Sequence, residues 1–200
     1  MIIDHPEFNS RIERLVGELE QGTQVEIVVV AARHSGSYRD VRLGLAATLG
    51  MLPLLVALYS PLQFHPASIP IYMLLFGVLG WWLAALGAWA PRTFTRSTRR
   101  QAQTLEAAKA TFVEVAVHGT RDRTGILVYV SELEGRAVIL RDLGLDGLIP
   151  GSVWNELALD LKDLDGLEAL LGQVGNILAE HVPAGDENPN EIPNAPRVRS

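Results

Sequence analysis

The sequence predicts an α/β domain that is interrupted by a transmembrane helical hairpin. Residues 43–91 contain no Asp, Glu, Lys or Arg, which is typical of membrane-spanning segments. Residues 25–32 and 126–130 are nearly continuous apolar runs rich in β-branched residues, as expected for strands buried on both faces of a sheet. Most of the remaining segments carry apolar residues at helical spacing, so helices are expected to cover both faces of that sheet.

The amino-terminal segment predicts a helix followed by the first strand. Asp4 is placed to cap this helix, Pro6 is tolerated in its first turn, and Gly22 is a suitable carboxyl-terminal stop. The apolar residues between them recur with the period of one helix face. The first strand then covers residues 25–32, and a Ser- and Gly-containing turn leads from it to the charge-free stretch.

The charge-free stretch divides into two predicted spans, residues 43–62 and 69–90, separated by a Pro-rich turn. Each has about the 20 apolar residues that cross a bilayer core of about 30 Å. A signal peptide would open the chain behind a short basic region, whereas this stretch follows a helix and a strand. A buried helical hairpin of a soluble protein is the alternative, although such helices normally carry a polar stripe.

The arginines near the two spans predict their orientation. Arginines flank the outer ends of the hairpin, and the turn between the spans has no Lys or Arg. They are Arg39, Arg42, Arg92, Arg96, Arg99 and Arg100. Because cytoplasmic loops are enriched in Lys and Arg, both termini are expected in the cytoplasm and the hairpin in the inner membrane. The same arginines are expected to contact anionic lipid at the membrane surface.

The carboxyl-terminal half predicts the rest of the α/β domain. Helices are expected at 97–117, 152–161 and 165–181, and strands at 126–130 and 135–141. The Pro-rich stretch 183–200 has few apolar residues and predicts a disordered tail. Residues 1–42 and 92–182 therefore form one domain, with 43–91 as the inserted hairpin.

Composition excludes several functional classes. The net charge is −6, which argues against nucleic-acid binding. The chain has no Cys, so disulfides, thiolate metal sites and cysteine nucleophiles are excluded. No phosphate-binding loop or dinucleotide fingerprint is present. The two spans carry no ionisable residue that would line an ion path, apart from the interfacial His65 in the turn.

Three short motifs resemble the TPM-domain family. They are Thr124-Gly125-Ile126-Leu127-Val128-Tyr129-Val130-Ser131, Glu134-Gly135-Arg136 and Asp142-Leu143-Gly144-Leu145-Asp146-Gly147. The family includes thylakoid-lumen phosphatase-like proteins linked to photosystem II repair and a regulator of acetylcholine receptors. More narrowly, the chain resembles bacterial membrane proteins in which a two-helix hairpin is inserted after the first strand of the domain. It covers residues 2–183 in element order and is most specific over 118–154.

The resemblance implies an α/β/α sandwich and, in some members, divalent-metal binding and acid-phosphatase activity. Family members often have Asp-Asn-Gly before the second strand, where this chain has Arg123-Thr124-Gly125. After the third strand the family has Gly-Tyr-Gly-Leu-Glu-Gly. Asp146 matches the Glu of that motif and keeps a carboxylate, whereas Leu143 replaces the Tyr.

Asp122, Asp142 and Asp146 are the candidate metal ligands, because carboxylates in neighbouring loops hold hard cations such as Ca²⁺ or Mg²⁺. The alternative is that these loop residues cap turns and helices. His118, Thr120 and Arg123 are further loop candidates, but no spacing identifies a nucleophile.

The sequence therefore favours a membrane-tethered cytoplasmic domain that binds or assembles membrane-protein complexes. The expected partners are the lipid bilayer and either another membrane protein or further copies of the chain. The alternative function is a divalent-metal-dependent phosphatase. No other cofactor is expected, and catalysis is the less favoured class.

Overall fold

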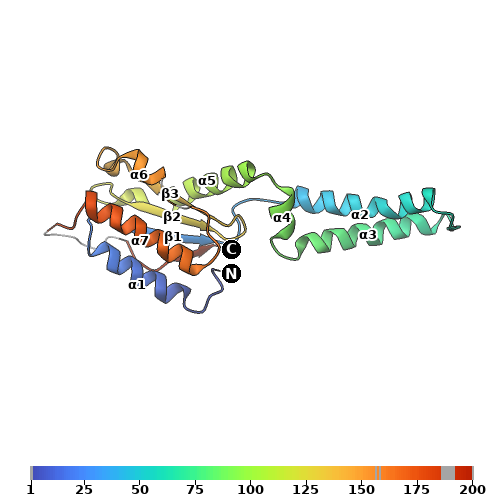
Figure 1. Cartoon of the computed structure of the whole chain (residues 1–200), viewed down its shortest axis with the longest axis horizontal. Helices are drawn as coiled ribbons and strands as arrows, with labels where there is room; N and C mark the ends of the chain where they lie inside the picture. Colours follow the sequence, from blue (N-terminus) through green and yellow to red (C-terminus); the bar gives the residue numbers. More distant parts are fainter. Residues whose placement is uncertain (1, 156, 158, 186–191, 200) are drawn as a thin grey trace. The chain divides into compact units, whose positions relative to one another are not determined.

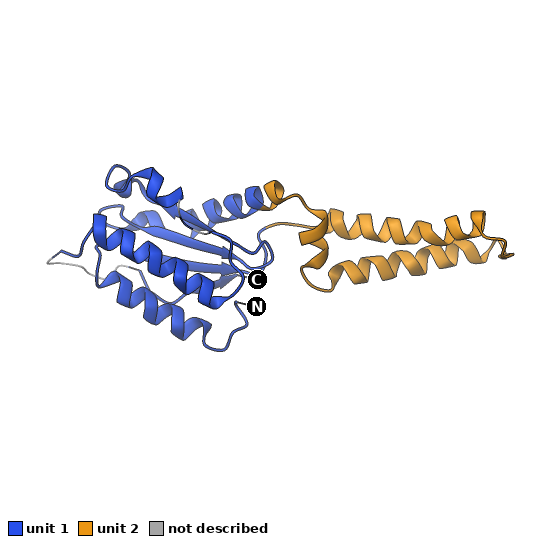
Figure 2. Cartoon of the chain, in the orientation of Figure 1, with its two compact units in different colours: residues 1–35, 101–200 blue, residues 36–100 orange. Residues whose placement is uncertain are grey.

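The computed structural model describes residues 2–155, 157, 159–185 and 192–199. The chain divides into two compact units, which Figure 2 colours separately. The α/β unit comprises residues 1–35 and 101–200, and the hairpin unit comprises residues 36–100. The second unit is thus an insertion into the first, as the sequence predicts.

The α/β unit contains one mixed sheet (Figure 1). Its strands are β1 (Ile27–Ala32), β2 (Ile126–Ser131), β3 (Arg136–Arg141) and β4 (Arg197–Arg199), in the order β3-β2-β1-β4. Strand β1 runs parallel to both β2 and β4, whereas β2 and β3 form an antiparallel hairpin. The three predicted strands are confirmed, and the sheet is mixed because the last two of them are joined directly.

Helices cover both faces of this sheet, as the apolar strands predict. On one face, α1 (Phe8–Glu20) and α7 (Leu164–His181) pack with β1 and β2 in the larger apolar core. On the other face, α5 (Ser97–Glu114) contributes Ala108 and Phe112 to a smaller core beneath Val28 and Tyr129. A short helix, α6 (Gly151–Asn155), follows β3. Figure 1 shows α1 and α7 side by side along the sheet.

The predicted cap of the first helix is wrong. Helix α1 begins at Phe8 without a side-chain cap, and Asp4 instead pairs with Arg33 at 2.7 Å. Helix α7 begins one residue before the predicted 165–181, and it is capped by Asp163, whose Oδ1 accepts the N–H of Gly166 at 2.8 Å. Sequence spacing allows several polar residues to cap a helix, and the preceding loop decides which one reaches the free N–H groups.

The prediction of a disordered tail over 183–200 is wrong for residues 192–199. Val198 pairs with Ala31, and the three residues of β4 extend the sheet beyond β1. Residues 186–191 and 200 of that prediction lie outside the described residues. The segment has little apolar surface of its own, so its order depends on hydrogen bonds to an existing strand.

The hairpin unit consists of α2 (Arg39–Tyr59), α3 (Ser68–Ala85) and the short α4 (Trp89–Phe94). Helices α2 and α3 are antiparallel and touch through small residues. A Cβ on Gly80 would lie 2.7 Å from the carbonyl oxygen of Leu45, so only glycine allows this approach. Ala84 is also buried at the contact. Small residues at this contact therefore allow the two helices to approach closely.

Both α2 and α3 are long and apolar enough to cross a membrane. The second helix is shorter than the predicted 69–90, because Gly87 adopts a φ of 85° after Ala85 and the chain turns into α4. The first helix begins earlier than the predicted 43–62, so Arg39 and Arg42 lie in its first two turns.

Candidate functional site

The two loops that carry the predicted metal ligands lie together at one end of the sheet. The loop 120–125 precedes β2 and the loop 142–149 follows β3, and antiparallel pairing brings these ends side by side. The N–H of Gly144 donates to the carbonyl oxygen of Arg123 at 2.9 Å. A Cβ on Gly144 would lie 2.5 Å from that same oxygen, so glycine is required for the two loops to pack.

Asp142 is the buried carboxylate of this site, with 4% of its surface exposed. Its Oδ1 accepts the N–H of Leu143 at 2.8 Å and caps the turn 143–145. Its Oδ2 lies 3.4 Å from Nε of Arg123 but makes no hydrogen bond. Asp142 therefore caps a turn in this structure and has Arg123 as a cationic neighbour. Turn capping is the alternative to metal binding that the sequence left open for these loop aspartates.

The other two candidate ligands, Asp122 and Asp146, are both exposed. Within the described part of the chain, no group of three or more His, Cys, Asp or Glu side chains is arranged to hold a metal ion. A divalent cation at Asp142 would also compete with Arg123 for the same oxygen. Binding of Ca²⁺ or Mg²⁺ by these aspartates stays a prediction.

The remaining loop candidates, His118 and Thr120, lie after α5. That helix ends at Glu114, and Ala116 adopts a left-handed φ of 56°, so His118 lies on a separate short turn. Its ring centroid is 6.4 Å from that of Phe112. Thr120 is buried and its Oγ1 has no hydrogen-bond partner. The predicted helix 97–117 therefore ends three residues early, at Glu114.

The loop 142–149, called the leucine loop below, presents apolar side chains to the surface. Leu143 is 65% exposed and Leu148 is 50% exposed, while Leu145 and Ile149 between and beside them are buried. The cap of Asp142 and the contact of Gly144 hold the backbone in place. A loop that is held in one conformation and exposes leucines is suited to bind an apolar surface of another molecule.

A second cluster, which sequence reasoning did not identify, lies at the carboxyl ends of β1 and β2. Ser35 Oγ is 2.7 Å from Ser131 Oγ and 3.2 Å from the hydroxyl of Tyr129. The N–H of Ser35 donates to Oε1 of Glu134 at 3.1 Å, and the Ser131 hydroxyl donates to Oε2 of Glu134. Ser131 and Glu134 are buried. Burial raises the pKa of Tyr129 above its usual value.

This strand-end cluster fixes Ser35, the last residue of the α/β unit before the inserted hairpin. Ligands of open α/β sheets bind near the carboxyl ends of parallel strands, so the position is a usual one for a site. Here, however, the hydrogen bonds of Ser35 join protein groups to one another and hold the turn after β1 to the β2–β3 turn. No spacing in the sequence predicts this, because Ser35 and Glu134 are far apart along the chain.

The six membrane-flanking arginines are not equivalent. Arg99 forms an ion pair with Asp40 at 2.5 Å and lies 5.9 Å from the ring centroid of Tyr38. Its charge is thus offset within the hairpin unit. Of the other five, Arg39, Arg42, Arg92 and Arg96 are exposed and Arg100 is half-buried.

Comparisons with known proteins support the fold only. No protein-family model and no curated protein matches the chain. Among solved structures, it is similar to the NMR structure of the BA42 protein from the psychrophilic bacterium Bizionia argentinensis sp. nov., with a TM-score of 0.57 and 15% sequence identity. The match covers 98% of this chain and 94% of that one. The chain therefore shares a fold with BA42, and at this identity the likeness extends no further.

Proposed function

We propose that the protein is an inner-membrane protein whose α/β unit is a TPM-like cytoplasmic domain that binds and assembles membrane-protein complexes. In this proposal α2 and α3 cross the bilayer as a hairpin. The observation that carries it is a charge-free helical hairpin, with exposed apolar side chains, inserted directly after the first strand of a folded domain.

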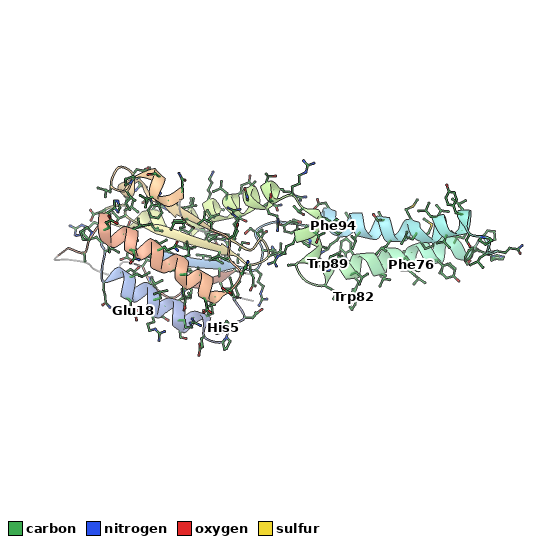
Figure 3. The ribbon with its side chains drawn as sticks, viewed as in Figure 1. His5, Glu18, Phe76, Trp82, Trp89 and Phe94 are labelled. Atoms are coloured by element: carbon green, nitrogen blue, oxygen red, sulfur yellow. The ribbon has the colours of Figure 1, made fainter. Side chains whose placement is uncertain are left out.

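The exposed surface of the hairpin supports a lipid environment. Leu58, Leu74 and Trp82 are each more than 60% exposed, and Figure 3 shows Phe76 and Trp82 on α3. Burying one such side chain is worth about 1.5–3 kcal/mol, so a surface with many of them is unfavourable in water. Only 6% of the most apolar 18-residue stretch of α2 is buried within the chain, and only 11% of the corresponding stretch of α3.

The arginines support the orientation. They lie at the outer ends of the hairpin, whereas its turn, 60–67, has none. All six arginines lie on one side of the hairpin and none lies on the other, which favours a cytoplasmic position for both termini.

Reporter fusions test this topology. A reporter inserted at Gln63 is expected to show the periplasmic signal, and one placed before Met1 the cytoplasmic signal. Cytoplasmic signals from both positions, together with release of the protein by carbonate washing, would contradict the proposal.

The leucine loop supports binding and assembly as the function. Its exposed leucines are held on a turn that Asp142 caps and that packs against the loop before β2 through Gly144. A photoreactive residue in place of Leu148 is expected to crosslink a membrane protein in intact membranes. The same residue in place of Val113, which is 66% exposed on α5, serves as the matched control.

The decisive result is dependence on the loop. Replacement of Leu143 and Leu148 together by Glu is expected to abolish the complex while leaving the protein in the membrane. An unchanged complex in this variant would show that the loop is not the binding surface.

A divalent-metal-dependent phosphatase is the second candidate, favoured by the buried Asp142 Oδ2 that makes no hydrogen bond. It predicts that millimolar Ca²⁺ or Mg²⁺ raises the melting temperature and that the purified protein hydrolyses phosphoesters. Asp146→Ala should remove both effects. A melting temperature unaffected by either ion, with no hydrolysis, would rule it out.

A further inference from the structure

The carboxyl-terminal segment 192–199 covers the edge of β1. Residues 197–199 pair in parallel with residues 30–32, and the N–H of Arg33 donates to the carbonyl oxygen of Arg199 at 3.2 Å. All three residues of β4 are exposed, and the segment adds only Ile192, half-buried, to the smaller apolar core. The segment is therefore held mainly by polar contacts.

The surface that receives the segment is acidic. Oε2 of Glu20 accepts a hydrogen bond from Asn194 Nδ2 at 2.6 Å, and Oε2 of Glu26 accepts one from the N–H of Ile192 at 3.3 Å. The other oxygen of Glu20 accepts the N–H of Ile27, at the beginning of β1. Two carboxylates thus anchor the first part of the segment beside the edge strand.

A third carboxylate anchors its end. Arg199 forms an ion pair with Glu114 of α5 at 2.9 Å and donates to Oγ1 of Thr111 at 2.5 Å. The segment carries two arginines and no acidic residue, whereas the groups that hold it include three glutamates. The two surfaces are therefore complementary in charge as well as in strand pairing.

We propose that this β1 edge is a strand-exchange site, and that in the membrane it binds the segment 192–199 of a second copy of the chain. This deepens the proposed assembly function, on which it rests, by naming the partner as a second copy. Each protomer would then supply its β4 to the sheet of the other.

The geometry keeps the free-energy cost of such an exchange small. β4 pairs through three residues, whereas β1 and β2 pair through six, and β4 lies at an edge of the sheet, so it can leave without separating the other strands. An exchanged segment makes the same contacts in another copy that it makes in its own, which is why domain swapping costs little. Confinement to one membrane raises the effective concentration of the second copy.

Disulfide trapping tests the proposal, since the chain has no native cysteine. Ala31 and Val198 are paired across β1 and β4, so the double variant Ala31→Cys/Val198→Cys is oxidised in native membranes. A dimer that disappears on reduction is expected. A disulfide found only within single chains would overturn the proposal. The matched control is Ala110→Cys/Val198→Cys, because Ala110 is exposed on α5 and lies outside the sheet.

A second measurement decides the question if no disulfide forms. Two differently tagged copies of the native chain are expected to copurify from mild detergent, and deletion of residues 192–200 is expected to abolish that copurification. Absence of copurification, or copurification unaffected by the deletion, would overturn the proposal. Crosslinking of a different membrane protein by the leucine loop would persist in either case, so failure of strand exchange is distinguishable from failure of the proposed function.

Discussion

The α/β unit and the hairpin unit differ in which apolar side chains they bury. In the α/β unit, leucines such as Leu167 and Leu171 are fully buried between α1, α7 and the sheet. In the hairpin unit, small residues such as Gly80 and Ala84 are buried between the helices, while Leu74 and Trp82 are exposed. The first pattern is that of a core protected from water, and the second is that of helices packed in lipid.

If the hairpin lies in lipid, as proposed above, two kinds of force hold the one chain. Large side chains stabilise the α/β unit by leaving water, so truncating them is costly. The hairpin has little to gain from that effect in lipid, so close backbone contact between its helices becomes more important. Mutations of similar chemistry should therefore have different consequences in the two units.

Leu171→Ala in the α/β unit is expected to have the largest effect. The variant leaves a cavity in the larger core, and the free energy of unfolding should fall by about 2–5 kcal/mol. Calorimetry in detergent measures this loss. Leu75→Ala, at a 57% exposed position of α3, is the matched control and should leave the unfolding of the α/β unit unchanged.

Leu75→Arg is expected to cost about 2.5–3.5 kcal/mol of membrane insertion, because a charge in the middle of a span is unfavourable in hydrocarbon. Val113→Arg, at a similarly exposed position of α5, should change stability by less than about 0.5 kcal/mol. Fractionation of membranes after expression measures both. Equal and small effects would indicate that the hairpin is exposed to water.

Gly80→Ala is expected to destabilise the α2–α3 contact by about 1–3 kcal/mol, since the added Cβ would overlap the backbone of α2. The thermal stability of the hairpin in detergent reports this change. Gly44→Ala provides the control, because a Cβ at Gly44 would meet nothing within 4 Å.

Ser131→Ala tests the strand-end cluster. It removes the hydroxyl between Ser35 and Glu134 and should cost about 1–3 kcal/mol, because the buried carboxylate loses a donor. Ser37→Ala, at an exposed position, should have no measurable effect on thermal unfolding. A loss of complex formation without a loss of stability would assign the cluster a binding role instead.

Glu20→Gln is expected to change the pH dependence of stability. Burial, together with the charge of Glu26, raises the pKa of Glu20 to about 7, against 4.5 without the fold. The folded state therefore binds a proton more tightly, so this contribution to stability is complete below pH 4.5 and is lost as the pH rises to 7. Melting temperatures of the variant should fall less over that range, and parallel curves would contradict the assignment.

Much of this architecture is predictable from local sequence. The strands β1, β2 and β3 are recognisable because apolar, β-branched runs suit buried sheet positions. The two apolar helices are recognisable because residues 43–91 carry no charge, and their insertion after β1 follows from their position in the chain. The loops of Asp122 and Asp142 meet because the strands beside them pair as an antiparallel hairpin.

Only the tertiary structure shows which partners the side chains of those loops contact and where the carboxyl-terminal segment pairs. The role of Asp142 as a turn cap beside Arg123 depends on side-chain directions that spacing leaves open. The cluster of Ser35 and Glu134 and the pairing of β4 with β1 join residues about a hundred or more positions apart. Composition and periodicity indicate whether a segment forms a helix or a strand and which of its faces is buried. The hydrogen-bond partner of a polar side chain, in contrast, depends on which distant segments pack beside it.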